Sequence, residues 1–342
     1  MKRTRKKVNL EAKTAELRTG LRGIFVEQPK EWIATARERL KDLPKTNFDL
    51  GCTFAARDQW FDAMFRFRVT LYLDKNYPQA LYNLGCCYVR LNKTAEAKQT
   101  FLAILKKNPA DQDALFMLAT IDPKAVPGNQ QPQHMPAEMV SGFFGRVAEG
   151  YDVAEADSKY QAGAVIHELA RPLVKVAAPR VLDLACGSGI VARPWRAEAA
   201  SIHGVDMTRE MIALAGAATH ADKKLYDSLT LADVAKLPPE VADASADVVL
   251  LINAAHFVGE LSSVMQGAAK ALAPQGVFVI TLEPYTGASG FGLMRETSRF
   301  GHTTAYAQQV ASAAGLVLVK ETPIELYAGT PAQAMVYSKG IN

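Results

Sequence analysis

Glycines and carboxylates recur at the ends of apolar runs in the second half of the chain. The stretch VLDLACGSGI (181–190) is an apolar run that contains Asp183 and ends in the turn Gly187-Ser188-Gly189. Glycines permit a tight turn and let the backbone approach a ligand closely. The next two apolar runs end in Asp206, which lies 19 residues after Gly187, and in Asp233. Because ligands bind beyond the carboxyl ends of the strands in open α/β sheets, this pattern predicts one ligand-binding edge.

The glycine turn alone fits more than one ligand class. Gly187 to Ala192 reads G-x-G-x-x-A, which also matches a dinucleotide fingerprint. Asp183 argues against that class, because NAD-binding strands are typically apolar up to the glycines. Asp206 is spaced to accept hydrogen bonds from both hydroxyls of a ribose, and Asp233-Val234 suits an adenine amino group and ring face. A NAD-dependent oxidoreductase is therefore kept as the weaker alternative.

The composition of the 342 residues is that of a soluble globular protein. It is 49% apolar and 22% charged, and the net charge of +4 is too small to argue for a nucleic-acid partner. MKRTRKK places five basic residues in the first seven, but no apolar signal segment follows, and no run approaches the roughly 20 apolar residues of a membrane span. The cysteines form no C-x-x-C pair and no secreted-domain pattern. We predict a cytoplasmic protein with reduced thiols, no metal site and no membrane partner.

The first half of the chain contains a repeat with a period of 34 residues. The matching positions are Leu50-Gly51 with Leu84-Gly85, Phe54 with Tyr88, Ala63 with Ala97, and Phe67 with Phe101. This pattern resembles the tetratricopeptide repeat over residues 44–121. The resemblance implies paired helices that dock a protein or peptide partner. Residues 1–43 are expected to form a basic arm and a helical cap, because a repeat array needs covered ends.

The chain changes character after the repeats. Residues 122–137 are rich in proline and read as a linker. From 138 to 342, apolar runs at RVLDLAC, SIHGVD, DSLTLAD, ADVVLLIN and GVFVITLE alternate with helix-like stretches such as GIVARPWRAEAA. Such alternation predicts an α/β domain with a mostly parallel sheet. The last two runs, LVLVKE and QAMVYSKG, have no helix between them and predict a reversed strand at the sheet edge.

The order of these motifs resembles the Rossmann-like SAM-dependent methyltransferases over about residues 140–342. The resemblance implies a seven-stranded sheet and S-adenosyl-L-methionine (SAM) as cofactor. Gly187 and Gly189 would approach its methionine portion, Asp206 its ribose and Asp233 its adenine, while Asp183 would support the turn and the cofactor's amino end. The full set of expected cofactor-binding residues is Asp183, Cys186, Gly187, Ser188, Gly189, Asp206, Met207, Asp233, Val234, Asn253 and Tyr151.

A narrower resemblance comes from two further segments. FFGRVAEGYD, which contains Tyr151, is similar to the lead-in helix that caps the cofactor in many methyltransferases. RFGHTTAYAQQ and LEPY are similar to segments of predicted bacterial methyltransferases that also carry tetratricopeptide repeats. Many of those relatives have Asp where Gly145 stands here. Most members of that group lack assigned substrates, so the resemblance names no acceptor.

Candidate residues for the acceptor side follow the fourth and fifth apolar runs. A sulfonium methyl group is already activated, so the protein mainly has to hold a nucleophile in line with it, and a base is needed only for a nucleophile that carries a proton. We expect His256, Glu283 and His302 as catalytic candidates, and Arg299 and Tyr306 as substrate-facing residues. The ordinary alternatives are a helix start at His256 and a helix cap by Thr303 or Thr304.

Two questions stay open at the level of sequence. The acceptor is either a protein, which the repeats favour, or a small molecule. The second hypothesis for the whole chain is an inactive methyltransferase fold that acts as a scaffold through its repeats.

Overall fold

The computed structural model describes residues 42–77, 79–151, 160–242, 246–294, 297–327 and 329–340. The basic arm and helical cap expected within 1–43 lie outside these residues, apart from the last two. The chain forms two compact units, residues 1–109 and 110–342, which we call the first and second units. Among the described helices, none has both the length and the apolar character needed to cross a bilayer.

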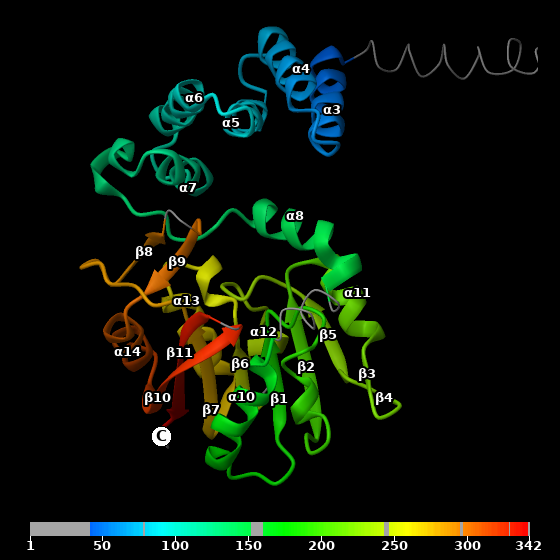
Figure 1. Cartoon of the computed structure of the whole chain (residues 1–342), viewed down its shortest axis with the longest axis vertical. Helices are drawn as coiled ribbons and strands as arrows, with labels where there is room; N and C mark the ends of the chain where they lie inside the picture. The colour runs from blue at the N-terminus through cyan, green and yellow to red at the C-terminus, as the bar shows by residue number, and fades with distance from the viewer. Residues whose placement is uncertain are drawn as a thin grey trace, which may run out of the picture. The chain divides into compact units, whose positions relative to one another are not determined.

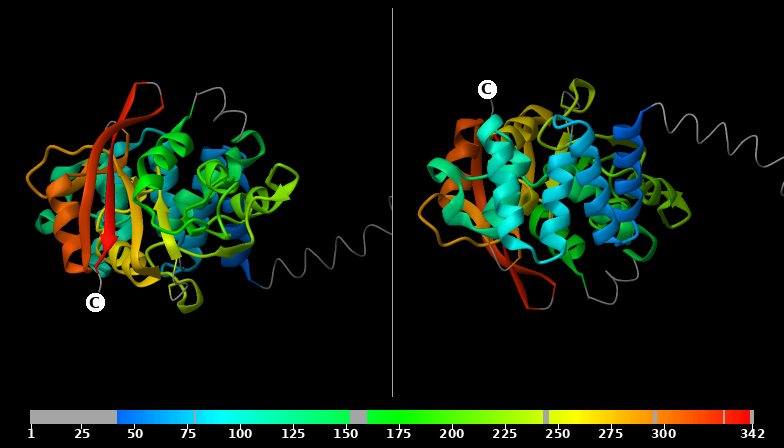
Figure 2. Two further views of the ribbon diagram at one scale, coloured as in Figure 1. Left: turned by 90° about the horizontal axis from the view of Figure 1, so that it is seen from below. Right: turned by 90° about the horizontal axis from the view of Figure 1, so that it is seen from above.

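The first unit consists of paired helices. They are α3 (Leu43–Ala55), α4 (Trp60–Leu73), α5 (Ala80–Arg90) and α6 (Thr94–Lys107), and they lie side by side in Figure 2 (right). The repeated glycines explain the close packing within each pair. A Cβ on Gly51 would lie 2.6 Å from the Phe67 ring, and a Cβ on Gly85 would lie 2.7 Å from the Phe101 ring. The 34-residue period therefore reflects one glycine–aromatic contact made twice.

The second unit is built on a seven-stranded sheet with the strand order β10-β11-β7-β6-β1-β2-β5 (Figure 1). The strands are β1 (Arg180–Leu184), β2 (Ser201–Asp206), β5 (Ser228–Leu231), β6 (Ala246–Leu251), β7 (Leu272–Leu282), β10 (Leu316–Tyr327) and β11 (Thr330–Lys339). Only β11 runs against its neighbours β7 and β10. The predicted mostly parallel sheet with a reversed C-terminal strand is confirmed, and Figure 2 (left) shows the β10–β11 hairpin in red at one edge.

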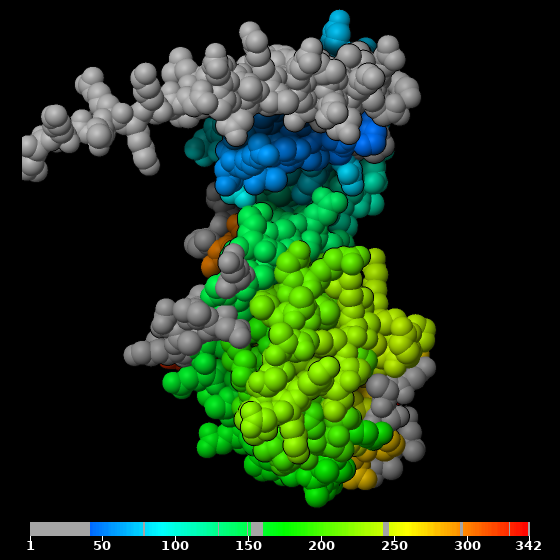
Figure 3. All heavy atoms as spheres, turned by 90° about the vertical axis from the view of Figure 1, so that its right-hand side faces the viewer, coloured from blue at the N-terminus to red at the C-terminus, as the bar shows by residue number. Residues whose placement is uncertain are grey.

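Each face of the sheet carries its own core. Successive side chains of a strand point to opposite faces, so Val248 and Leu250 belong to one cluster and Val249 and Leu251 to the other. Helices α13 (Ser262–Ala271) and α14 (Thr304–Ala313) cover the second of these faces. Helix α10 (Ala162–Ala170) covers the first, together with Ala215 of α11 (Arg209–Ala217). In Figure 3, residues from the middle of the chain, coloured green to yellow-green, form most of the visible surface of the second unit.

One expected helix is wrong. GIVARPWRAEAA, after β1, forms a series of tight turns and the short 3-10 helix η5 (Arg193–Trp195) instead of an α-helix. Backbone N–H groups there donate three residues back, as from Gly189 to Cys186 and from Ala192 to Gly189. Pro194 lacks the N–H group that an α-helix would need and disfavours the helical conformation of the residue before it. The glycine turn therefore leads into no α-helix N-terminus.

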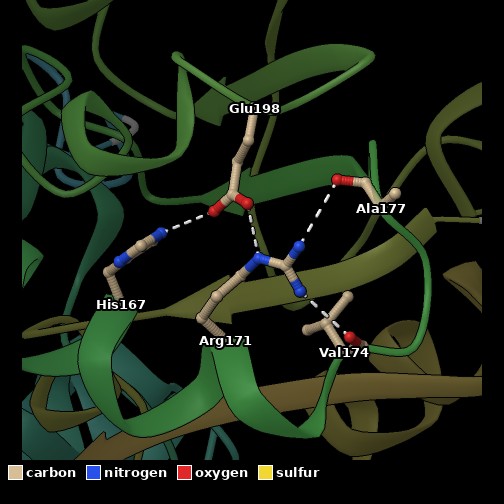
Figure 4. A network of polar contacts seen from close by, with 5 residues as sticks. All are labelled: His167, Arg171, Val174, Ala177 and Glu198. Carbon is tan, nitrogen blue, oxygen red and sulfur yellow. Dashed lines mark hydrogen bonds and ion pairs between the residues drawn. The ribbon is translucent and has the colours of Figure 1, made fainter.

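A network of polar contacts fixes α10 beside these turns (Figure 4). Glu198 accepts hydrogen bonds from His167 Nε2 at 2.7 Å and from Arg171 Nε at 2.5 Å. The Arg171 guanidinium also donates to the carbonyls of Val174 and Ala177, at 3.0 and 3.4 Å. Burial opposes ionisation of Glu198, but its bonds with His167 and Arg171 lower its pKa. The network ties α10 to the chain that follows the glycine turn.

The segment between the repeats and the sheet is partly regular. Helix α7 (Gln112–Ile121), which the repeat pattern assigned to the first domain, belongs to the second unit. The proline-rich segment forms two 3-10 turns, η1 (Pro123–Ala125) and η2 (Pro127–Asn129), and then a β-bridge between His134 and Val258. Helix α8 (Ala137–Val147) follows as the expected lead-in helix.

Two short antiparallel ladders supplement the main sheet. Strands β3 (Thr219–His220) and β4 (Lys223–Lys224) pair after α11. Strands β8 (Phe291–Met294) and β9 (Arg299–His302) pair between β7 and α14. The sequence left open a pocket-lining role for Arg299 and His302 or a helix cap by Thr303 or Thr304. The structure forms strand β9 at Arg299–His302, and Thr303 caps α14, because its Oγ1 accepts from the Tyr306 N–H at 3.2 Å.

Candidate active site

A cavity of about 630 Å³ lies in the second unit, at the carboxyl ends of β1, β2, β5 and β6. The strand order reverses between β1 and β6, which is where open α/β sheets bind ligands. Residues after these four strands form one side of the cavity, which we call the strand wall. The other side, the helix wall, comes from α7, residues 133–138, α8 and residues 257–263.

The glycine turn of the strand wall is held in a conformation that requires glycine. Gly187 has φ +53° and Gly189 has φ +98°, and a Cβ on Gly189 would lie 2.5 Å from Leu225. Asp206 joins this turn to the next strand, since its Oδ2 accepts from the Gly187 N–H at 3.0 Å and its Oδ1 from the Thr208 N–H at 2.8 Å. Burial raises the pKa of Asp206, and these backbone bonds act against that rise.

Nine of the eleven expected cofactor residues line the cavity. They are Tyr151, Cys186, Gly187, Ser188, Asp206, Met207, Asp233, Val234 and Asn253. The structure places the other two, Asp183 and Gly189, outside the lining. Asp183 lies within β1 with 2% of its surface exposed, where it accepts a hydrogen bond from the Tyr226 hydroxyl at 2.7 Å. Burial is the main cause that raises its pKa to about 7.

Several of the lining residues also have structural partners. Asp233 Oδ1 accepts from the Ala235 N–H at 2.9 Å, so this carboxylate caps a turn as well as facing the cavity. Asn253 has φ +55°, a conformation that Asn tolerates better than most residues, and its N–H donates to Thr281 Oγ1 at 2.7 Å. These bonds fix the ends of β5 and β6 against the cavity.

The strand wall has the chemistry needed for a SAM-like ligand. Ser188 is 2% exposed, lines the cavity, and its Oγ has no hydrogen-bond partner among the described residues. Buried polar atoms in folded proteins normally have a partner, so this hydroxyl indicates a place for a ligand group or a water. Asp206, which is 7% exposed, and Asp233 both line the cavity, and their carboxylate acceptors fit ribose hydroxyls and an adenine amino group. No group of three or more potential metal ligands occurs among the described residues.

The expected catalytic residues do not line the cavity. Glu283 Oε1 accepts from Arg299 Nη1 at 3.0 Å and lies 3.6 Å from His256 Nδ1. His302 Nε2 lies 2.8 Å from the carbonyl oxygen of Val258 and donates to the backbone there. None of these groups lines the cavity, and His302 is bonded to the segment of the helix wall that carries Val258. Their catalytic role stays a prediction that the geometry does not favour.

Burial keeps both histidines neutral. It lowers the pKa of His302 to about 4, against the opposing effect of its bonds to the carbonyls of Gly259 and Val258. Burial, with the nearby Arg299 and His302, also lowers the pKa of His256 well below its ordinary value. A base with so low a pKa accepts protons poorly at neutral pH.

Tyr306 does not line the cavity but is bonded to Glu260, which does. Its hydroxyl donates to Glu260 Oε1 at 3.2 Å and accepts from the Leu261 N–H at 3.0 Å. Glu260 itself lines the cavity, as do Asp113, His134, Glu138 and Tyr160, none of which was expected from the sequence. These residues carry no motif, and only their position beside the strand ends could have identified them.

Aromatic side chains close the cavity between α8 and the end of β6. Phe144 contacts Tyr151 and Phe257, with ring centroids 6.1 and 5.7 Å apart. All three line the cavity. The placement of Tyr151 is consistent with the expected cap over the site.

Comparison with known proteins assigns the two parts of the chain. Residues 182–280 match the family model described as a methyltransferase domain, and residues 79–111, covering α5 and α6, match the tetratricopeptide repeat model. Two curated relatives are malonyl-[acyl-carrier protein] O-methyltransferases. The one from Enterobacter lignolyticus (strain SCF1) is 29% identical over 144 residues, covering 42% of this chain and 53% of the relative. The one from Erwinia pyrifoliae is 33% identical over 117 residues, covering 34% of this chain and 40% of the relative.

The chain thus spans about half the length of the curated relatives it matches, or less. Among solved structures, the [4+2]-cyclase SpnF superposes with a TM-score of 0.51 at 14% identity, covering 61% of this chain and 99% of that chain. At that identity the likeness concerns the fold. Motifs, sheet order and family matches agree, and the chain carries a Rossmann-like (class I) methyltransferase domain together with a tetratricopeptide repeat.

Proposed function

We propose that the second unit binds SAM and catalyses transfer of its methyl group to an acceptor. The observation that carries this proposal is the strand wall, where Asp206 is bonded to the glycine turn and the buried Ser188 hydroxyl lacks a partner among the described residues. The methyltransferase family match over residues 182–280 supports it independently. The missing α-helix after the glycine turn weakens the dinucleotide alternative, because that fingerprint places a pyrophosphate on a helix N-terminus.

The chain's own residues would hold the cofactor at the strand wall. Asp206 would accept from the ribose, Asp233 and Val234 would face the adenine, and the Gly187 and Asn253 segments would lie along the methionine portion. When bound, SAM supplies an activated sulfonium methyl carbon. Phe144 and Phe257 would exclude water, and the helix wall would hold the acceptor near that carbon. Holding two reactants in line accounts for a large part of such a rate enhancement.

A calorimetric titration of the full-length protein with SAM, and with its demethylated product S-adenosylhomocysteine (SAH), tests the proposal. Asp206→Asn should weaken binding roughly ten-fold or more, since a hydrogen bond to a charged group contributes about 1.5–3 kcal/mol. Asp227→Asn is a matched control. Asp227 also accepts a backbone N–H, from Ile202 at 2.7 Å, but at the amino end of β2. Absence of SAM and SAH binding, or equal binding by both variants, would disprove the proposal.

For the first unit we propose docking of a protein or peptide, supported by the tetratricopeptide match. The second hypothesis, a scaffold without catalysis, predicts a different result in one experiment. Incubation of cell extract with methyl-labelled SAM and the purified protein should label an acceptor if the protein is an enzyme. SAM binding without label in protein or small molecules would favour the scaffold. A cytoplasmic location stays part of the proposal.

A further inference from the structure

The helix wall of the cavity is acidic. Its ionisable side chains are the carboxylates of Asp113 on α7, Glu138 on α8 and Glu260 ahead of α13, together with His134. No lysine or arginine occurs among the described residues of this wall. Among the described residues that line the whole cavity, Lys236 is the only one, and it follows Asp233 on the strand wall. An acceptor that lies on the helix wall therefore meets three carboxylates.

These groups belong to a built structure. The Gln133 carbonyl accepts from the Gly259 and Glu260 N–H groups at 2.8 and 2.9 Å, and the Met135 N–H donates to the Phe257 carbonyl at 2.9 Å. Gln112 on α7 joins the same structure, because its Oε1 accepts from the Gln133 N–H at 3.0 Å. The three segments that carry the acidic side chains and His134 are thereby held together.

Glu260 is oriented by its neighbours. Its Oε1 accepts from the Ser262 N–H at 3.0 Å, from the Ser262 hydroxyl, and from the Tyr306 hydroxyl at 3.2 Å. The simplest interpretation is that Glu260 caps the start of α13, because its Oε1 accepts the bonds from Ser262. The three bonds also hold the Glu260 carboxylate in the cavity lining, and its Oε2 takes part in none of them.

The negative charge at Asp113 is not fully balanced. Burial raises its pKa, the nearby Asp111 and Glu138 raise it further, and His134 acts in the opposite direction. The neighbouring carboxylates repel the charged form of Asp113, and a cation bound beside Asp113 would remove that repulsion. A carboxylate ligand in the same place would add to the repulsion and lose its hydration.

We propose that the methyl acceptor is an amine that is cationic at neutral pH, bound by Asp113, Glu138 and Glu260 on the helix wall. This inference rests on the proposed function. The cavity that holds this wall also contains the buried Ser188 hydroxyl, unpartnered among the described residues, which points independently to a ligand. A protonated nitrogen has no lone pair to donate, so its proton must leave first, to water or to His134. The freed lone pair would then form the N–CH3 bond while the S–CH3 bond of SAM breaks, and SAH would be the leaving group. The curated relatives are named for malonyl-[acyl-carrier protein], and the charge of this wall disfavours such an acidic acceptor here.

The test measures binding to the full-length protein saturated with SAH. Three probes are titrated by calorimetry, namely spermidine for a small polyamine, an Ala-Lys-Ala peptide for a protein side chain, and malonate for an acidic acceptor. At least one amine should bind and malonate should not. The isosteric double variant Asp113→Asn/Glu260→Gln should weaken amine binding roughly ten-fold or more, as expected for loss of a charge-assisted bond. Glu138→Gln, which changes an exposed side chain, should weaken it less.

Glu168→Gln is the control, because Glu168 is a carboxylate on α10 that does not line the cavity. It should leave amine binding unchanged, and every variant should bind SAH like the wild type. The inference is overturned if neither amine binds, if amine binding is equal in wild type and double variant, or if malonate binds. Loss of SAH binding by the wild type would instead refute the proposed function, so the two failures are distinguishable.

Discussion

Asp183 should make the protein less stable as the pH rises from about 4 to about 7. Its carboxylate is 2% exposed in β1, and burial is the main cause that raises its pKa from 3.8 to about 7, while the bond from Tyr226 acts against the rise. Below pH 3.8 the group is neutral in both states. Between 3.8 and about 7 the unfolded chain ionises and the folded chain stays protonated, so stability falls with pH. Above about 7 the cost is constant.

The size of this effect follows from the pKa. A rise from 3.8 to about 7 corresponds to roughly 4 kcal/mol, at about 1.4 kcal/mol per pKa unit. Asp183→Asn keeps the shape and an oxygen that can accept from Tyr226, but removes the charge. Asp183→Asn should therefore gain stability relative to the wild type as the pH rises. The difference between their free energies of unfolding should grow from acidic to alkaline pH by at most roughly 4 kcal/mol.

Urea unfolding from about pH 4 to about pH 8 measures this difference, and Asp247→Asn on β6 is the matched control. Burial also acts on Asp247, but hydrogen bonds from Arg180 lower its pKa. Asp247 therefore contributes stability that is fully present above its ordinary pKa of 3.8. The stability difference between Asp247→Asn and the wild type should stay nearly constant from about pH 4 to about pH 8. A difference for Asp183→Asn that stays constant with pH would refute the reasoning. If Asp183 supports the amino end of the cofactor, wild-type SAH affinity should also rise above about pH 7, and that of Asp183→Asn should not.

Three further predictions concern packing and the buried histidine. Gly163→Ala should destabilise the protein by roughly 1–3 kcal/mol in thermal melts, because the new Cβ would lie 2.8 Å from a backbone oxygen. Gly142→Ala is the control: the nearest atom to its Cβ would be 3.7 Å away, so this variant should be more stable by up to about 1 kcal/mol. Gly85→Ala should destabilise the first unit by a similar amount, since its Cβ would lie 2.7 Å from Phe101, and Phe101→Leu in the same chain should recover part of the loss. His302, with its pKa lowered to about 4, contributes stability that is present above about pH 6.5 and is lost as the pH falls towards 4. His302→Gln should remove that acid dependence in urea unfolding, and an unchanged acid limb would contradict it.

The sequence alone determined the elements whose signal is local. The 34-residue period predicted the helix pairs, because each pair needs a glycine opposite an aromatic ring, as at Gly85 and Phe101. The alternation of apolar runs predicted the sheet and its reversed strand. Asp183 was expected to support the glycine turn, but Asp206 accepts the bond from the Gly187 N–H and Asp183 accepts one from Tyr226. The prediction of a helix after β1 was wrong, because Pro194 lacks the N–H group that an α-helix needs at that position.

The tertiary structure decided which side chains reach the cavity. His302 was a reasonable candidate by type and position, but its ring donates to the backbone at Val258 and is buried behind the wall. Asp113 and Glu260 are far apart in the sequence and carry no motif, yet they line one wall. Their meeting depends on hydrogen bonds between Gln133 and the segment before α13, contacts far apart in the chain. Local patterns encode elements and turns, whereas the direction of a side chain depends on packing between distant segments.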